Sequence, residues 1–317
     1  MNKLTTELKT LQETTINNLR NSKSKNTLRA YKSDFKDFAF FCDKHNLRSL
    51  PTEPNTISLY LTHLSKKSKV STLRRRLVSI SMVHKLKGHY VDIKNPIIVD
   101  NLTGIRRSLG SIQKGKKPLL ATQLKMIINE INNQKIEEIV KLRDKSIILI
   151  GFAGGFRRSE IVSIDYEDLE FVNEGLKIIV KKSKTDQYGE GMIKGLPYFA
   201  NKNNCPVYNI KKWLEISKIK SGAIFRRFSK GSKLSNNRLT DQSVALLIKK
   251  YLNLSDIEAS NFSGHSLRSG FATLAAESGA SERSIMAMTG HKSTQMVRRY
   301  IKEVNIFKNN ALNNVEI

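Results

Sequence analysis

Apolar residues recur at helical spacing through the first hundred residues of the chain. Between residues 27 and 45 they fall three or four positions apart, which predicts an amphipathic helix with Asn26 or Thr27 at its cap. A second helix is expected after Pro54, a third over 71–86 and a fourth after Pro96. The stripes of the first and third helices are Leu28, Tyr31, Phe35, Phe38 and Cys42, and Leu73, Leu77, Ile80 and His84. We expect their aromatic rings in a core, because large apolar side chains are mostly buried.

The pattern becomes mixed beyond residue 118. Helices are predicted at 122–132, 138–153, 207–216, 241–252 (with Thr240 as its cap), 266–279 and 281–290. A β-branched run at 176–182 and a second apolar run at 192–198 flank a polar segment with two glycines. That order predicts a strand, a loop and a returning strand. The expected fold is mostly α-helical, with a small antiparallel β-sheet or hairpin in the second part of the chain.

The length of 317 residues favours two domains over a single core. Residues 109–118, rich in glycine and lysine without periodicity, are expected to link an all-α domain at 1–108 to a mixed domain at 119–317. The same stretch places Gly110 and Gly115 at the spacing of a phosphate-binding loop. We reject a nucleotide site, because Lys117 replaces the Ser or Thr that binds magnesium and no strand precedes the loop.

Positive charge dominates the composition. The chain has 55 Lys+Arg against 28 Asp+Glu, a net charge of +27, which favours a polyanionic partner such as nucleic acid. An AT-rich genome that overuses lysine is the alternative. No acidic residue lies between Glu53 and Asp92, so that stretch is the first candidate for DNA contact. The basic residues predicted to bind DNA are Lys66, Lys67, Lys69, Arg74, Arg75, Arg76, Arg106 and Arg107.

Several classes of protein are disfavoured. No apolar run approaches the roughly 20 residues of a membrane span, and the N-terminus lacks the order of a signal peptide. Cys42 and Cys205 stand far apart without metal or redox spacing, which suits a reducing compartment. We expect a cytoplasmic, DNA-associated protein of a bacterium, phage, plasmid or other mobile element, with no metal or cofactor.

Four distant segments carry the candidate chemistry. They read GGFRRSEIVSI at 154–164, KKSKTDQ at 181–187, GHSLRSGFATLA at 264–275 and TGHKSTQMVRRY at 289–300. Each alone is a weak signal, because short motifs often match by chance. Together, in this order, they resemble the tyrosine recombinase (phage integrase) family, with its G-x-R-x-x-E turn, hairpin lysine, H-x-x-R, G-H and a tyrosine nine residues later. The helical first part resembles the family's core-binding domain, in a two-domain arrangement most like that of Cre.

The resemblance implies a site that binds a phosphodiester of DNA. Arg157 and Arg268 would clamp its non-bridging oxygens, because arginine matches such oxygens bidentately. His265 and His291 would donate hydrogen bonds to the phosphate, and His265 could also accept the proton of the nucleophile. Glu160 would orient a basic partner.

The resemblance assigns the nucleophile and the general acid to Tyr300 and Lys184. A tyrosine of pKa about 10 is ionised in only about one molecule in a thousand at pH 7, so it needs a positive field or a base. Tyr300 would form a 3′-phosphotyrosine, and Lys184 would protonate the departing 5′ oxygen, with Lys181 or Lys182 as the alternative acid. The bond energy stays in the intermediate, so neither ATP nor a metal is required.

Departures and rival functions remain open at this point. Arg158 occupies a position that is usually apolar in the family, so the clamp could be shifted by one residue, and Ser269 stands where relatives often have His. A topoisomerase-like enzyme or a catalytically silent DNA-binding regulator are the alternatives to a site-specific recombinase. The resemblance also implies a homo-oligomer, a tetramer on inverted-repeat sites of double-stranded DNA, assembled through the apolar C-terminal tail.

Overall fold

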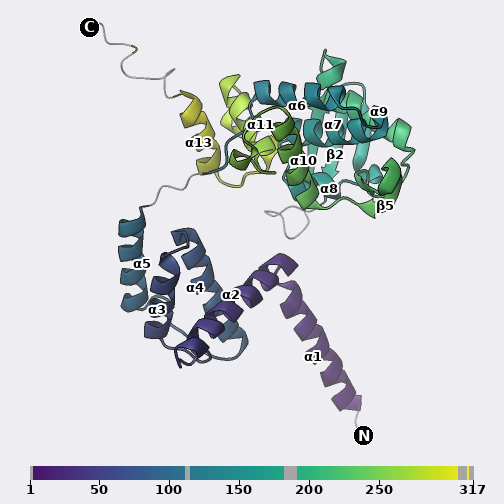
Figure 1. Ribbon diagram of the computed structural model, residues 1–317. Helices are drawn as coiled ribbons and strands as arrows, with labels where there is room; N and C mark the ends of the chain where they lie inside the picture. The colour runs from purple at the N-terminus through teal and green to yellow at the C-terminus, as the bar shows by residue number, and fades with distance from the viewer. Residues whose placement is uncertain (1–2, 111–114, 182–190, 306–312, 314–317) are drawn as a thin grey trace. The chain divides into compact units, whose positions relative to one another are not determined.

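A computed structural model describes residues 3–110, 115–181, 191–305 and 313 of the chain. The chain divides into two compact units, Met1–Lys114 and Gly115–Ile317. Most of the described residues are helical, as the sequence predicted, and the strands form two small antiparallel sheets where a single sheet or hairpin was expected (Figure 1).

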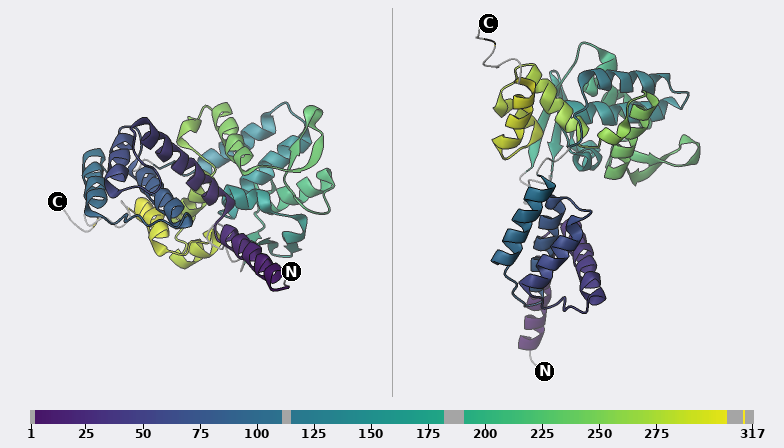
Figure 2. Two further views of the ribbon diagram at one scale, coloured as in Figure 1. Left: turned by 90° about the horizontal axis from the view of Figure 1, so that it is seen from below. Right: turned by 60° about the vertical axis from the view of Figure 1, so that its left-hand side comes forward.

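Unit 1 is a bundle of four helices preceded by a fifth. The helices are α1 (Lys3–Asn21), α2 (Lys25–Lys44), α3 (Pro54–Ser65), α4 (Val70–Leu86) and α5 (Pro96–Leu109). The helices α2 to α5 correspond to the four predicted ones. Helix α1, which the sequence analysis did not predict, leads away from the bundle in both views of Figure 2, and its large apolar residues Leu8, Leu11 and Ile16 are exposed.

Two details of the bundle differ from or refine the prediction. The cap of α2 is Ser24 rather than Asn26 or Thr27, because its hydroxyl accepts a hydrogen bond from the Thr27 amide at 3.2 Å. The predicted stripe of α4 is buried. At its end, His84 accepts from the Thr52 amide at 3.1 Å, and its other ring nitrogen lies 2.9 Å from the Ile80 carbonyl. This histidine is therefore a satisfied core residue.

Unit 2 contains eight α-helices and five strands among its described residues. They are α6 (Ala121–Asn133), α7 (Glu138–Ala153), α8 (Arg158–Ser163), β1 (Leu169–Val172), β2 (Gly175–Val180), β3 (Met192–Pro197), α9 (Pro206–Ser217), β4 (Arg226–Phe228), β5 (Leu234–Arg238), α10 (Asp241–Leu254), α11 (Ser266–Glu277), α12 (Glu282–Thr289) and α13 (Thr294–Asn305). Short 3₁₀ helices occupy Tyr166–Asp168, Lys202–Asn204, Lys230–Ser232 and Ala259–Asn261. The chain has joined this unit by residue 117, whose amide donates to the Asn261 carbonyl at 2.8 Å.

The predicted hairpin is present as β2 and β3, and β1 adds a third strand to give the order β1-β2-β3. The antiparallel register pairs Leu176 with Leu196 and Ile178 with Lys194. Strands β4 and β5 form a separate antiparallel pair. The elements α8, β1, β4 and β5 were not predicted, because each is too short for its periodicity to show in the sequence.

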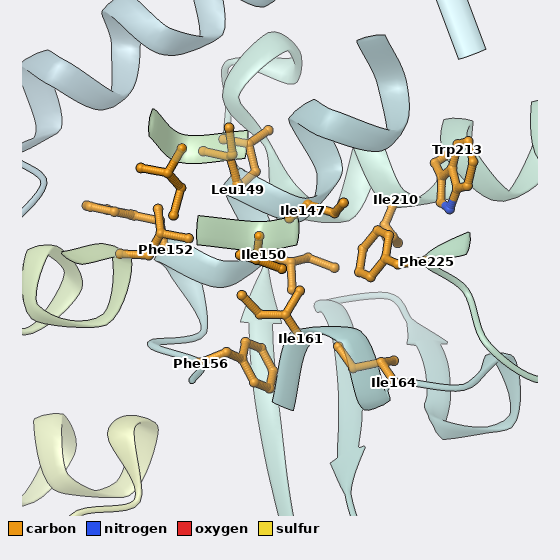
Figure 3. Packing of buried hydrophobic residues seen from close by; sticks show 14 of the residues in the cluster. Ile147, Leu149, Ile150, Phe152, Phe156, Ile161, Ile164, Ile210, Trp213 and Phe225 are labelled. Carbon is orange, nitrogen blue, oxygen red and sulfur yellow. The ribbon is translucent and has the colours of Figure 1, made fainter. Parts of the chain in front are cut away.

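One large hydrophobic cluster holds unit 2 together. Figure 3 shows its centre, where α7 contributes Ile147 and Ile150, and where Phe156 and Ile161 come from the turn after α7 and from α8. Because α7 and α8 are fixed in this core, the turn between them at 154–157 has a defined position. That turn carries the first predicted arginine.

Both cysteines are free thiols in the two cores. Cys42 is buried in the core of unit 1, and burial raises its pKa to about 11. Cys205 is buried in unit 2, where its sulfur accepts from the amides of Phe199 and Tyr208. Across the described residues, no helix combines the length and the apolar character that a membrane span needs.

Candidate active site

The turn between α7 and α8 presents Arg157 through two adjacent glycines. Gly155 has a φ of +54°, a conformation that glycine adopts without strain. A Cβ atom there would also lie only 3.0 Å from the ring of Phe271 and 3.1 Å from Thr289. Both the backbone conformation and the close packing against α11 and α12 therefore favour glycine at position 155.

Glu160 holds both the backbone and the side chain of Arg157. One oxygen of the buried carboxylate accepts from the Arg157 backbone amide at 2.9 Å, and the other accepts from its guanidinium at 2.6 Å. The neighbouring Arg158 points elsewhere: its side chain is 47% exposed and pairs with Asp241 at 3.0 Å. Of the two arginines that the sequence left open, Arg157 is the one held by the buried carboxylate, as the G-x-R-x-x-E spacing predicted.

Arg268, on α11, is almost fully buried, with 1% of its surface exposed. Its Nη1 donates to the Gly155 carbonyl at 2.9 Å, but its buried Nε and Nη2 have no hydrogen-bond partner among the described residues. Burial, followed by repulsion from Arg157, lowers the pKa of Arg268 to about 10, while Glu160 and Tyr300 act in the opposite direction. A buried cation with two unused donors is arranged to receive an anion.

His265 lies directly before α11, three residues from Arg268, and its side chain is exposed. The position after Arg268 is Ser269, whose hydroxyl donates to the His265 carbonyl at 3.1 Å. Ser269 is thus tied to the start of its own helix.

The protonation of His291 follows from its hydrogen bonds. The hydroxyl of buried Thr289 donates its only proton to the Ile285 carbonyl at 2.6 Å, so it must accept from His291 Nδ1, which lies 2.7 Å away. Burial, and then the charges of Arg268 and Arg157, lower the pKa of His291 to about 4, so the ring is neutral at pH 7. The free protein therefore offers Nε2 as an acceptor, and donation to a phosphate from this atom requires the ring to gain a proton.

Tyr300 lies on α13, a helix that packs against α11 and α12. Its ring is half-buried against a small cluster formed by Ala272, Ile285 and Val297. Its influence on the pKa of Arg268 places it in the same electrostatic neighbourhood as the two arginines. The hydrophobic packing of the ring and a nucleophilic role for its oxygen are therefore compatible.

The predicted general acid Lys184 and the alternative Lys182 lie outside the described residues. Lys181 is described, and its ammonium forms an ion pair with the buried Asp168 at 2.7 Å. A fourth lysine, Lys194 on β3, was not predicted, and it is 1% exposed. A signal was available, because strand alternation puts residue 194 on the same face as the inward Leu196.

Basic residues also gather on unit 1 around a hollow of about 610 Å³ between the α3–α4 connection and the end of α5. We call this the basic hollow, and define it by Lys66, Lys67, Lys69, Arg74 and Arg106. Five predicted DNA-binding residues from two distant segments are thus brought together on one surface.

The other three predicted residues have different surroundings. Arg75 and Arg76 form ion pairs with Asp34 and Asp37 of α2, so they join α4 to α2. Arg76 also donates to the Tyr60 hydroxyl at 2.6 Å. Arg107 is exposed on α5 and does not line the basic hollow.

Comparison with known proteins decides the family. A model of the phage integrase family matches residues 117–305. The integrase/recombinase xerD homolog of Selenomonas ruminantium is 42% identical over 298 residues, which cover 93% of this chain and 86% of the relative. The chain belongs to the phage integrase family. It is therefore a tyrosine recombinase, and the matched segment contains every predicted catalytic residue from Arg157 to Tyr300.

Solved structures share the phage integrase fold at low identity. XerH site-specific recombinase bound to a palindromic difH substrate matches with a TM-score of 0.61 and 17% identity over 82% of this chain and 73% of that chain. Lambda integrase (residues 75–356) bound to DNA matches with a TM-score of 0.59 and 16% identity over 93% and 94%. These likenesses extend the match in fold to most of the chain.

Proposed function

We propose that this phage integrase family member cuts and rejoins double-stranded DNA at specific sites, with Tyr300 as the nucleophile. The observation that carries the proposal is the guanidinium of Arg268, buried beside Arg157 and near Tyr300 with two donors unused among the described residues. Burying a cation without a counter-ion is costly. A phosphodiester, with one negative charge and two non-bridging oxygens, supplies the missing acceptors.

The proposed reaction uses the residues that the family resemblance assigns to catalysis. Arg157 and Arg268 hold the non-bridging oxygens, and they stabilise the charge that gathers there as the Tyr300 oxygen bonds to phosphorus. The exposed His265 accepts the tyrosine proton, and Lys184 donates a proton to the 5′ oxygen whose bond to phosphorus breaks. The 3′-phosphotyrosine then reacts with a 5′ hydroxyl, which reverses the step and joins the strands.

Two assays distinguish this function from its rivals. Trapping a covalent adduct on a nicked duplex identifies an enzyme, whereas a catalytically silent regulator would bind the DNA and form no adduct. Exchange of strands between two duplexes identifies a recombinase, whereas a topoisomerase-like enzyme would relax supercoils without exchange. Sequencing the DNA that is covalently attached to the purified protein would reveal the target site.

We further propose that the basic hollow binds the phosphates that flank the cleavage site. Replacing Lys67, Lys69 and Arg74 by Ala should weaken binding and reduce the slope of log K against log salt by about 2 to 3, because each phosphate contact contributes about 0.9. These residues are exposed, so the bundle should keep its stability. The measurement is duplex affinity across a salt series.

A matched control removes the same charge from unit 2. The triple variant Lys135→Ala, Lys211→Ala, Lys249→Ala should leave the salt slope closer to that of the wild type, although the net charge falls equally. Equal slopes for the two triple variants would mean that only total charge matters. Arg76 is unsuitable for such a test, because its loss would also break the ion pair with Asp37.

We also propose that the C-terminal tail joins protomers on paired, inverted DNA sites into a tetramer. The tail, at 306–317, includes the apolar residues Ile306, Phe307 and Leu312, and its residues 306–312 lie outside those described. Unit 2 offers an apolar groove of about 590 Å³ that could receive such a segment from a second copy. Its lining includes Leu124, Leu149, Phe152, Phe199, Phe271, Leu274 and Met288.

Truncation after Asn305 should therefore spare binding to a single site and abolish cooperative occupancy of paired sites. Phe199→Asp, which places a charge at the half-exposed rim of the groove, should have the same effect with an intact tail. Band-shift titrations on single and paired sites provide the measurement. If truncation destroys cooperativity and Phe199→Asp preserves it, the tail binds another surface.

A further inference from the structure

Lys194 contacts the turn that carries Arg157 at two points. Its ammonium donates to the Gly154 carbonyl at 2.7 Å, and the same nitrogen lies 4.1 Å from the centre of the Phe156 ring. The first contact is a hydrogen bond and the second is a cation–π interaction. Both residues lie within three positions of Arg157, so the lysine is attached to the backbone immediately before it.

Arg268 holds the next carbonyl of the same turn. Its Nη1 donates to Gly155, so two buried cations from different elements, β3 and α11, bind two consecutive carbonyl groups. The turn is thereby fixed from both sides, while Glu160 fixes the Arg157 side chain. These contacts leave little freedom in the position of Arg157 relative to Arg268.

The folding of unit 2 alone does not explain a lysine at this place. Residue 194 is on the inward face of β3 beside Leu196, where an apolar side chain would pack without losing hydration. Lys194 is also repelled by Arg268 and Arg157, with Glu160 as the opposing charge. Apolar residues of similar volume often replace a whole buried ion pair without loss of stability, so packing does not require a charge at this place.

We propose that Lys194 is a positioning residue for strand transfer: it fixes the Gly154–Gly155 turn against β3 and thereby sets the geometry of the clamp formed by Arg157 and Arg268. The inference rests on the proposed function of those arginines. Strand β3 begins eight residues after Lys184 in the sequence, so Lys194 attaches the first described strand after the proposed general acid to the turn of the clamp.

The charge of Lys194 contributes to the same role. Burial lowers its pKa to about 7, with Glu160 raising it and Arg268 and Arg157 lowering it further. The charge of Lys194 in turn contributes to the lowered pKa of His291. A phosphate bound by the clamp adds a negative charge to this set, so it favours the protonated lysine. The positive field then increases at the moment when the phosphate is in place.

The decisive variant is Lys194→Met, which keeps the length of the side chain and removes the donor and the charge. We expect it to fold, to bind the duplex within about twofold of the wild type, and to form the covalent adduct at least about tenfold more slowly in single-turnover assays. Lys194→Arg, which restores both donor and charge, should recover part of the rate. If Lys194→Met fails to fold, the comparison of Lys194→Arg with Lys194→Gln takes its place, with Arg expected to be the faster.

Lys145 provides a matched control in the same unit. It is also a buried lysine whose pKa is lowered by burial, and it lies on α7 about two helical turns before Ala153. Its ammonium donates to the side chains of Asn132 and Asn203 and not to the turn of the clamp. Lys145→Met should cleave at the wild-type rate once stability is matched. Equal losses of cleavage in the two Met variants, or wild-type cleavage by folded Lys194→Met, would overturn the positioning role. Neither result would affect the proposed function, which the wild-type adduct tests separately.

Measuring proton uptake on DNA binding tests whether the charge of Lys194 contributes to its role, or whether the side chain acts only by packing. Calorimetry of duplex binding at pH 8 in buffers of different ionisation enthalpy should show proton uptake by the wild type and less uptake by Lys194→Met. Glu160, Arg157, Arg268 and His291 face Lys194, and the lysine shifts the pKa of His291. Both proteins are therefore compared in a His291→Gln background, where the difference in uptake reports on the lysine. Identical uptake by both proteins would contradict the contribution of its charge.

Discussion

Tyr300→Phe is expected to abolish the covalent protein–DNA adduct completely while folding and DNA binding stay at wild-type levels. The substitution keeps the ring that packs against Ala272, Ile285 and Val297 and removes only the oxygen that would attack phosphorus. A gel assay for adduct formation on a nicked duplex, together with a duplex-binding titration, provides the measurement. Residual adduct in this variant would show that another residue is the nucleophile.

A sulfur-containing substrate tests the other end of the same reaction. Lys184→Ala should bind DNA and cleave about 10²–10⁴ more slowly, because an alkoxide is a poor leaving group without a general acid. In a duplex with sulfur in place of the bridging 5′ oxygen, the 5′ thiolate is a good leaving group and needs no proton. This substrate should therefore restore cleavage to Lys184→Ala and have no effect on Tyr300→Phe. If neither variant is rescued, the acid is another hairpin lysine, and Lys182 would be tested next because Lys181 is paired with Asp168.

Arg268→Lys is expected to lower the rate of cleavage by at least about 10³-fold. An arginine that stabilises the charge on a transferring phosphoryl group contributes about 10³–10⁵ in rate. Lysine keeps the positive charge, but it lacks the planar fork whose Nε and Nη2 are unused in the free protein. Single-turnover cleavage at saturating protein measures this effect separately from binding.

The adjacent pair of arginines supplies the control for this experiment. Arg158→Lys changes a half-exposed side chain that pairs with Asp241, so its cleavage rate should remain within a few-fold of the wild type. If Arg158→Lys loses most of its cleavage rate and Arg157→Lys loses little, Arg158 and not Arg157 is the clamp residue. Wild-type cleavage by Arg268→Lys would mean that charge alone is sufficient at this position.

The sequence predicted α2 to α7, α9 to α12 and the hairpin because their periodicity extends over many residues, whereas the 19-residue helix α1, whose large apolar residues are exposed, was not predicted. Short elements such as α8 and β1 were not predicted, since their position depends on the core into which Phe156 and Ile161 pack (Figure 3). The choice between Arg157 and Arg158 could be made from the spacing to Glu160. The structure shows Glu160 bound to Arg157, because a carboxylate three residues after a helix cap returns to the residue at the cap; the role of Arg157 in the clamp stays a prediction.

Other properties of the site could not be predicted from local patterns. Arg74, Arg75 and Arg76 are indistinguishable in the sequence, yet Arg75 and Arg76 have carboxylate partners more than thirty residues away on α2. The contact of Lys194 with Gly154 likewise joins residues that are 40 positions apart. Such pairings depend on how helices and strands pack in three dimensions, which the periodicity of a single segment does not specify.

The burial of both thiols makes the chain suited to site-specific fluorescent labelling. An exposed thiolate is the nucleophile that attacks thiol-specific reagents, whereas Cys42 and Cys205 are enclosed in the two cores and the raised pKa of Cys42 suppresses its ionisation further. Cysteines introduced at exposed positions, one on each unit, could therefore carry a donor and an acceptor dye without removal of the native cysteines. Energy transfer between the dyes would report the distance between the two units, with and without DNA, in the working enzyme.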